Sequence, residues 1–96
     1  MPTISVIIPA YNAGSTILET ITSVQQQTFS DFEIIVINDG STDRTLELLS
    51  TVKDPRLKIF SYSNGGVPVA RNHGLEHATG DFIAFLDAGL AHLKPY

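Results

Sequence analysis

Residues 34–43 are Ile34-Ile35-Val36-Ile37-Asn38-Asp39-Gly40-Ser41-Thr42-Asp43, an apolar run followed by a polar turn. The apolar, β-branched half is typical of a strand that is covered on both faces of a parallel sheet. The second half is a Gly-containing turn with residues that start helices. Asp39 therefore stands where a strand ends, which is where open α/β sheets bind ligands. A purely structural alternative is that Asp39 makes an Asx-turn and that Ser41 or Thr42 caps the next helix.

Apolar runs and helical periodicity alternate along the chain. Pro9 lacks a backbone N–H, so we expect it to close the first strand. Thr16 and Glu19 have capping-box spacing at the start of the first helical stretch, and Pro68 suits the first turn of the last one. The predicted strands are Ile4–Ile8, Phe32–Asn38, Leu57–Ser61 and Phe82–Leu86, and the predicted helices begin near Ser15, at Ser41 or Thr42, and near Pro68.

Strands that alternate with helices in this way predict an α/β fold, a Rossmann-like parallel sheet of about four strands flanked by helices. If the first three strands step outward and the fourth returns to the other side of the first, the strand order is 3-2-1-4. The sheet then has a switch point between strands one and four. Tyr11, Asp39 and Asp87 all follow strands, so they would line the same crevice. Because residues far apart in the sequence converge there, the sequence predicts a ligand site at this crevice.

Composition narrows the class of protein. The chain has 96 residues, 43% of them apolar, and no apolar run near the ~18 residues that cross a bilayer. A net charge of −4 argues against a general nucleic-acid binder, which needs a surplus of Lys and Arg. The chain has no cysteine and no visible secretory signal. We therefore expect one soluble domain in the cytoplasm. A peripheral position at the inner face of the membrane is the alternative location.

Two common phosphate-binding motifs are absent after the first strand. The segment Pro9-Ala10-Tyr11-Asn12-Ala13-Gly14 is neither G-x-G-x-x-G nor a P-loop, which argues against a dinucleotide dehydrogenase and a P-loop kinase. A receiver-like module is also disfavoured, because no acidic cluster follows this strand.

Four segments together resemble a known family. They are Val6-Ile7-Ile8-Pro9-Ala10-Tyr11-Asn12, Ile37-Asn38-Asp39-Gly40-Ser41-Thr42-Asp43, Ala70-Arg71-Asn72-His73-Gly74 and Gly80-Asp81-Phe82-Ile83-Ala84-Phe85-Leu86-Asp87-Ala88. In this order and spacing they are similar to the N-terminal half of family 2 glycosyltransferases, which have the GT-A fold. The resemblance implies transfer of a sugar from a nucleotide diphosphate sugar, expected to be a UDP-sugar, with inversion. The acceptor would be a hydroxyl of a saccharide or of a lipid-linked molecule.

The resemblance also implies roles for five residues. Pro9 and Tyr11 would lie against the nucleotide, with the Tyr11 ring near the base. Asp39 would accept a hydrogen bond from the base, such as the N3–H of uracil. Arg71 would face the nucleotide, where a guanidinium suits diphosphate oxygens. Asp87 would face the ribose and a Mg²⁺ or Mn²⁺ ion that bridges the diphosphate and neutralises charge on the leaving group.

Two departures from the family pattern limit these implications. Where the family reads Asp-Ala-Asp-Asp, this chain reads Asp87-Ala88-Gly89-Leu90, so the usual direct metal ligand is missing. The general base belongs to a later part of the family's fold, so no catalytic residue is assigned. We expect residues 1–88 to form the nucleotide-sugar-binding domain and residues 89–96 an atypical tail. Its His92 is read as a solvated side chain rather than a replacement ligand.

One alternative function stays open. The chain could be a truncated, non-catalytic remnant that binds nucleotide or self-associates, because Gly89 replaces a carboxylate and the edge of the fourth strand invites a homo-oligomer. His73 and His77 have the i, i+4 spacing of a helical metal pair, but no third ligand is evident, and an exposed helix face is the simpler interpretation.

Overall fold

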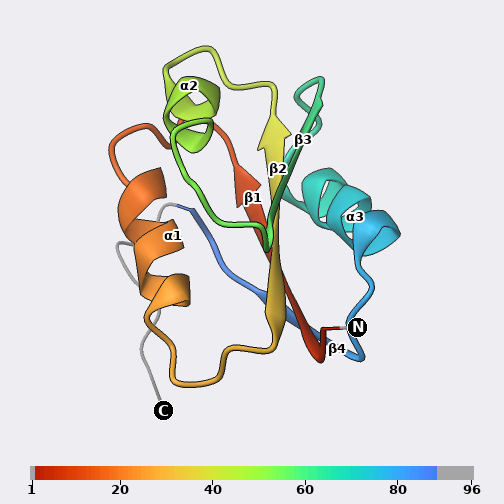
Figure 1. Ribbon diagram of the computed structural model, residues 1–96. Coiled ribbons are helices and arrows are strands. Elements are labelled where there is room, and N and C mark those ends of the chain that lie inside the picture. The colour runs from red at the N-terminus through yellow and green to blue at the C-terminus, as the bar shows by residue number, and fades with distance from the viewer. Residues whose placement is uncertain (1, 89–96) are drawn as a thin grey trace.

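The computed structural model describes residues 2–88 of the chain. The elements are β1 (Ile4–Ala10), α1 (Ile17–Gln25), β2 (Phe32–Asp39), α2 (Thr45–Leu49), β3 (Leu57–Tyr62), α3 (Val67–His77) and β4 (Phe82–Phe85). The strands form one sheet in the order β3-β2-β1-β4, and each neighbouring pair is parallel. Helices α1 and α2 lie on one face of the sheet and α3 on the other (Figure 1). The predicted α/β fold, strand order and switch point are confirmed.

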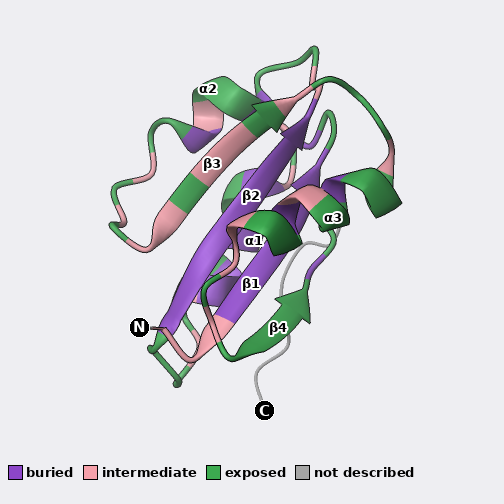
Figure 2. Ribbon diagram, turned by 90° about the vertical axis from the view of Figure 1, so that its right-hand side faces the viewer, coloured by how far each residue is buried: buried purple, intermediate pink, exposed green. Residues whose placement is uncertain are grey.

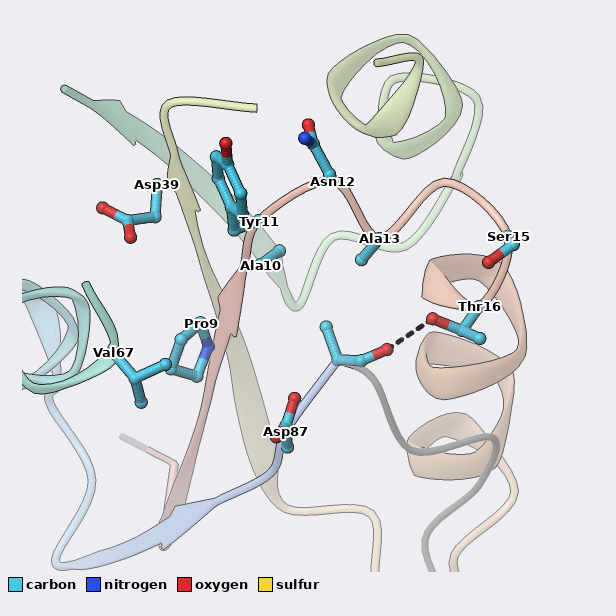
Figure 3. Close-up of a pocket in the computed structure, with 11 residues that line it drawn as sticks. Pro9, Ala10, Tyr11, Asn12, Ala13, Ser15, Thr16, Asp39, Val67 and Asp87 are labelled. Carbon is cyan, nitrogen blue, oxygen red and sulfur yellow. Dashed lines mark hydrogen bonds between the residues drawn. The ribbon is translucent and has the colours of Figure 1, made fainter. Parts of the chain in front are cut away.

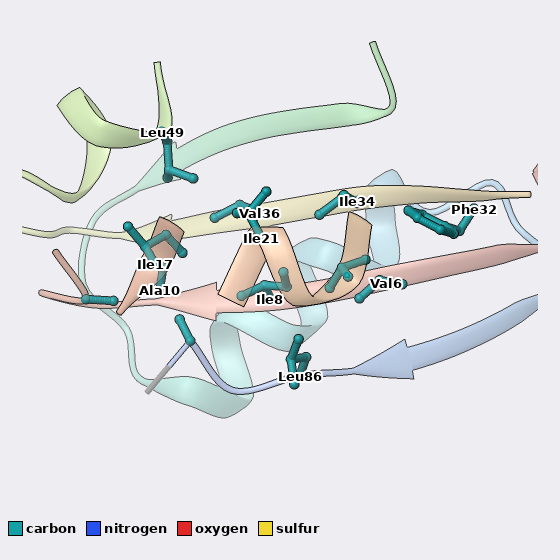
Figure 4. Close-up of a cluster of buried hydrophobic side chains, with 13 residues drawn as sticks. Val6, Ile8, Ala10, Ile17, Ile21, Phe32, Ile34, Val36, Leu49 and Leu86 are labelled. Atoms are coloured by element: carbon teal, nitrogen blue, oxygen red, sulfur yellow. The ribbon is translucent and has the colours of Figure 1, made fainter. Parts of the chain in front are cut away.

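The larger core lies between the sheet and helices α1 and α2 (Figure 4). Alternate residues of β1 and β2, such as Ile8 and Val36, point to this face and meet Ile17 and Ile21 of α1. All four side chains are at most 1% exposed. Burial of this size contributes about 1.5–3 kcal/mol for each large aliphatic side chain. The apolar run 34–37 therefore lies at the centre of the sheet, in a strand, β2, that is buried along its whole length.

Helix α3 approaches the other face of the sheet unusually closely. Its small residues Ala70 and Gly74 lie over Ile7 of β1, and a Cβ atom added at Gly74 would be 2.3 Å from the Ile7 Cγ2 atom. The second core cluster, which contains Ile35 and Ile37 besides Ile7 and Ala70, fills this interface. The position of α3, and of the residues at its N-terminus, is thus set by a backbone-to-sheet contact that only glycine permits.

The two histidines of α3 take part in ring stacking with β3. The His77 ring stacks on Phe60 with centroids 3.6 Å apart, and the His73 ring stacks on Tyr62 at 3.7 Å. The Tyr62 hydroxyl also lies 2.8 Å from the His77 Nε2 atom. Their i, i+4 spacing therefore serves the packing of α3 on β3. They are half-buried, not on an exposed face as the sequence suggested.

Pro9 lies inside β1 rather than after it, so the predicted end of this strand was wrong by two residues. The Ile7 carbonyl accepts a hydrogen bond from the Leu86 N–H, which shows that this side of β1 faces β4. Two residues further on, Pro9 faces the same side, but β4 has already ended at Phe85, opposite Ile7. The missing N–H of Pro9 therefore removes no bond from the ladder.

The first two helices begin later than the sequence predicted. Thr16 precedes α1 without making a side-chain cap within the described residues, so the expected capping box is not formed. Its hydroxyl donates to the Ala88 carbonyl instead. Helix α2 begins at Thr45, because residues 41–44 form the turn that connects it to β2. In both cases the residues that were expected to cap the helix make hydrogen bonds to other parts of the chain instead.

The two edges of the sheet differ in how they are covered. In Figure 2 the central strands β1 and β2 are largely buried, whereas all four residues of β4 are exposed. Phe82 is the most exposed large apolar residue of the described part, at 65%. Among residues 2–88, no helix has the length and hydrophobicity needed to cross a membrane.

Candidate functional site

A cavity of about 330 Å³ lies at the carboxyl ends of the strands, at the switch point between β1 and β4. It is bounded by the loop after β1, the end of β2, the start of α3 and the segment after β4 (Figure 3). Its lining residues are Pro9, Ala10, Tyr11, Asn12, Ala13, Ser15, Thr16, Asp39, Val67, Asp87 and Ala88. Four of the five residues predicted from the resemblance, Pro9, Tyr11, Asp39 and Asp87, therefore come together here.

Tyr11 stands at the start of the loop after β1 with 54% of its surface exposed. The next residue, Asn12, has a left-handed backbone with a φ of 47°, a conformation that Asn tolerates better than most residues. Its side-chain oxygen accepts the Thr42 N–H at 2.7 Å, and its own N–H donates to the Ser41 Oγ at 3.0 Å. These bonds fix the loop against the turn after β2, which holds Tyr11 in place beside the cavity.

Asp43 continues this scaffold. Its carboxylate accepts the Gly14 N–H at 3.0 Å and the Thr45 N–H at 2.9 Å. The hydrogen bonds from Thr45 lower the pKa of Asp43 below its ordinary value, so the group stays charged near neutral pH. The Ala13 N–H in turn donates to the Thr45 Oγ1 at 2.9 Å. The Ser-Thr-Asp part of the motif thus joins two loops, a role that helix-starting propensity alone did not indicate.

Asp39 is the last residue of β2 and is only 3% exposed. Its carboxylate is turned away from the Tyr11 ring, toward the N-terminus of α3 (Figure 3). There it accepts the Gly65 N–H on Oδ1 at 2.9 Å and the Gly66 N–H on Oδ2 at 3.0 Å. A buried carboxylate needs such donors, because its charge is otherwise costly away from water.

Asp87 reaches the cavity because the chain around it is tied to both β1 and α1. Leu86 donates its N–H to the Ile7 carbonyl, as described above. The Ala88 carbonyl accepts the Thr16 hydroxyl at 2.6 Å and the Thr20 hydroxyl at 3.3 Å. The exposed Asp87 side chain lies between these anchors on the cavity wall (Figure 3).

Arg71 is the one predicted site residue that is not part of the cavity lining in the described chain. It lies on α3, with its guanidinium carbon 5.3 Å from the centroid of the Phe85 ring. Val67, in the first turn of the same helix, does line the cavity, although it is not one of the residues predicted from the sequence. The sequence signal for a cavity position was a Val that directly follows a Gly-rich loop and starts a helix. An apolar residue at that place is equally typical of a core position.

Of the two carboxylates that line the cavity, that of Asp39 is buried and accepts backbone N–H groups, so the exposed carboxylate of Asp87 is the candidate ligand for a divalent cation. Within residues 2–88 there is no group of three or more His, Cys, Asp or Glu side chains that could hold a metal. Mg²⁺ commonly uses one or two carboxylates together with substrate phosphates and water. Asp87 fits that mode of binding, in which the ligand completes the coordination. Position 89, where the family pattern has its second carboxylate, lies outside the described residues.

The sheet topology and the cavity at its switch point define an open α/β protein of the type that binds ligands at strand ends. The chain matches the model of glycosyl transferase family 2 over residues 5–95, and it belongs to this family. The resemblance carried by its four motifs is thereby confirmed, and the family is one of transferases with the GT-A fold.

Named relatives are considerably longer than this chain. An uncharacterized glycosyltransferase of Haemophilus influenzae is 45% identical over 91 residues, which are 92% of this chain and 36% of the relative. The chondroitin synthase of Pasteurella multocida is 40% identical over 90 residues, 92% of this chain and 9% of that protein. The chain therefore spans about a third or less of the relatives that it matches.

Two solved structures are similar in fold. S. aureus TarS residues 1–349, in complex with UDP-GlcNAc, has a TM-score of 0.84 at 36% identity; the match covers 91% of this chain and 26% of that one. The mannosyltransferase PcManGT of Pyrobaculum calidifontis, in complex with GDP-Man and Mn²⁺, also has a TM-score of 0.84, at 29% identity, covering 92% and 28% of the two chains.

Proposed function

We propose that this chain is the donor-binding half of a glycosyltransferase that uses a nucleotide diphosphate sugar, most simply a UDP-sugar. The observation that carries the proposal is the cavity at the switch point, which gathers Tyr11, Asp39 and Asp87 from three separate strand ends. The nucleotide sugars bound to TarS and PcManGT support this choice of ligand class. Uracil and guanine, their bases, both carry a ring N–H that a carboxylate such as Asp39 can accept.

In this proposal each residue holds one part of the donor. The Tyr11 ring lies against the base, and Asp39 accepts its ring N–H. Val67, which lies beside Pro9 in Figure 3, contributes an apolar part of the wall, and Arg71 turns from Phe85 toward the diphosphate. Asp87 meets the ribose and shares a Mg²⁺ or Mn²⁺ ion with the diphosphate; when bound, the ion neutralises charge on the leaving group.

The acceptor hydroxyl, of a saccharide or a lipid-linked molecule, and the general base for inverting transfer would come from outside these residues. The proposed cellular location is the cytoplasm or the inner face of the membrane.

A second candidate function is that of a non-catalytic remnant that binds nucleotide or self-associates. The exposed edge strand β4 favours it.

Calorimetric titration of the 96-residue chain with uridine diphosphate tests the proposal. We expect binding that Mn²⁺ strengthens, and we expect Asp39→Ala to weaken it at least about tenfold, because a charge-assisted hydrogen bond in a buried site is lost. Asp87→Asn should remove most of the Mn²⁺ effect and leave the metal-free affinity within about twofold, since one charge contact is lost.

A suitable control is Glu47→Gln, which removes an exposed carboxylate on α2 that pairs with Arg44 and lies outside the cavity lining. Equal binding by the parent and by Asp39→Ala would mean that the proposed site is wrong. No binding of uridine or guanosine diphosphate by the parent would favour the remnant.

A further inference from the structure

Asn64 connects the loop before α3 to the end of β2. Its Nδ2 atom donates to the Asp39 backbone carbonyl at 3.0 Å and lies 3.3 Å from the Asp39 Oδ2 atom. Asp39 lines the cavity, whereas Asn64 is not among its lining residues. The contact with Asp39 is therefore the route by which Asn64 affects the site.

The carboxylate of Asp39 is almost fully used by this loop. A carboxylate offers about four lone-pair sites. Within the described chain, Gly65 occupies one site on Oδ1, while Gly66 and Asn64 occupy two on Oδ2. One acceptor site on Oδ1 is left for a ligand. Three donors around one small group also fix its rotation, so the remaining site has a defined direction.

Two glycines make this close approach possible. Gly40, which follows Asp39, has a φ of +72°, and a Cβ atom there would be 2.6 Å from the Asn64 backbone nitrogen. Gly66 has a φ of +91° just before α3 begins. Both conformations strain any other residue. The contact between the turn after β2 and the loop before α3 therefore depends on a glycine in each of them.

We propose that Asn64 is a positioning residue that gives the site its selectivity for a base with a ring N–H. It holds the Asp39 carboxylate so that the one open acceptor site meets a donor, as uracil N3–H would provide. Cytosine has an acceptor at the same ring position and would face a carboxylate lone pair. The inference rests on the function proposed above and extends it to the source of base selectivity.

The test compares the affinities of uridine diphosphate and cytidine diphosphate, measured by calorimetry on three chains. The parent should bind the uridine compound at least about tenfold more tightly, a difference of ~1.4 kcal/mol. Asn64→Ala should lose about tenfold in affinity for uridine diphosphate, with the affinity for cytidine diphosphate nearly unchanged, so the preference disappears. Gln26→Ala, an exposed amide at the C-terminus of α1, should behave as the parent.

A second variant provides a readout that loss of structure alone would not give. Asn64→Asp keeps the shape of the side chain but places a second carboxylate against that of Asp39, which raises one of the two pKa values. When the pH is lowered far enough to protonate the introduced carboxyl, the donor is restored. Affinity for uridine diphosphate should therefore rise in Asn64→Asp as the pH falls, and it should not rise in Asn64→Ala.

The possible failures are distinguishable. If the parent binds no nucleotide, the proposed function is wrong. If the parent prefers uridine diphosphate and Asn64→Ala keeps the same preference, or loses both ligands equally while circular dichroism shows a folded chain, the inference about Asn64 is wrong. If Asn64→Ala does not fold, Asn64→Asp decides, and an affinity that is independent of pH overturns the inference.

Discussion

Glu33 is a buried carboxylate in the amino-terminal half of β2, at the end of the sheet opposite the cavity. It is 3% exposed and accepts hydrogen bonds from Ser5 Oγ at 2.6 Å, Lys58 Nζ at 2.8 Å and the Thr79 N–H at 2.7 Å. Burial alone raises the pKa of Glu33, but the hydrogen bonds from Lys58, Ser5 and Thr79 outweigh it and lower the pKa from 4.5 to about 2. This one side chain joins β1, β2, β3 and the segment after α3.

A pH dependence of stability follows from this lowered pKa. Because the pKa is lower in the folded chain than in the unfolded one, the stabilising effect is complete above about pH 4.5 and is lost as the pH falls toward 2. Glu33→Gln should lower the free energy of unfolding at pH 7 by about 1–3 kcal/mol, since donors are left without their carboxylate. The substitution should also make the decrease of the unfolding free energy between pH 4.5 and 2 less steep, as measured by urea denaturation at a series of pH values.

Glu47→Gln is the matched control for this experiment. Its carboxylate pairs with Arg44 at the surface, with 63% of the Glu47 side chain exposed, so the change in unfolding free energy should stay below about 0.5 kcal/mol. A pH profile of Glu33→Gln that is identical to that of the parent would contradict the role given to Glu33.

At the level of elements, the close packing of α3 on β1 is the contact most sensitive to volume. Gly74→Ala should lower the free energy of unfolding by about 1–3 kcal/mol, because the new methyl group overlaps Ile7 and the helix must move outward. It should also weaken nucleotide binding, since α3 carries Val67 into the cavity. Thermal unfolding and calorimetry measure the two effects.

Asn72→Ala on the exposed side of α3 is the control for this substitution. It adds a residue of high helix propensity without a packing change, so stability should stay within about 0.5 kcal/mol. Gly74→Ala with parent-like stability would mean that α3 can move away from the sheet at little cost.

The elements show where sequence reasoning succeeds. The apolar, β-branched run of β2 predicted a central strand, because a strand buried on both faces is typically rich in such residues. The starts of α1 and α2 were not predictable, since Thr16 and Asp43 bond to residues far along the chain. Pro9 was misplaced for a related reason: whether a missing N–H matters depends on where the neighbouring strand ends.

The candidate site was predictable to a similar extent. Residues that directly follow strands, such as Tyr11 and Asp87, could be placed from the order of the strands alone. The parts contributed by the loop before α3 could not be placed. The contact of Asn64 with Asp39 depends on backbone angles at Gly40 and Gly66, which the sequence permits but does not specify.

At the level of the whole molecule, the exposed strand β4 predicts self-association of this 96-residue chain. Phe82, Ile83 and Phe85 are 65%, 39% and 46% exposed on a strand whose one neighbour within residues 2–88 is β1. We expect sedimentation velocity to show an average mass that rises with concentration in the micromolar range. Phe82→Lys should shift the chain toward the monomer, because a charged side chain on an edge strand opposes pairing.

Leu46→Lys is the control for association, since Leu46 is 45% exposed on α2 and lies away from the β4 edge. An equal effect of both substitutions would point to a surface other than β4. A mass that is monomeric and constant across the same range would exclude self-association through this edge.

The hydrogen bond from Thr16 to the Ala88 carbonyl has a consequence for the order of events during synthesis. Its two residues are 72 positions apart, so loop closure between them comes late for a chain that emerges from its N-terminus. Tyr11 and Asp39 can reach their places while the last strand is still inside the ribosome, but Asp87 cannot. The cavity that contains Tyr11, Asp39 and Asp87 is therefore complete in a nascent chain only after β4 has paired with β1.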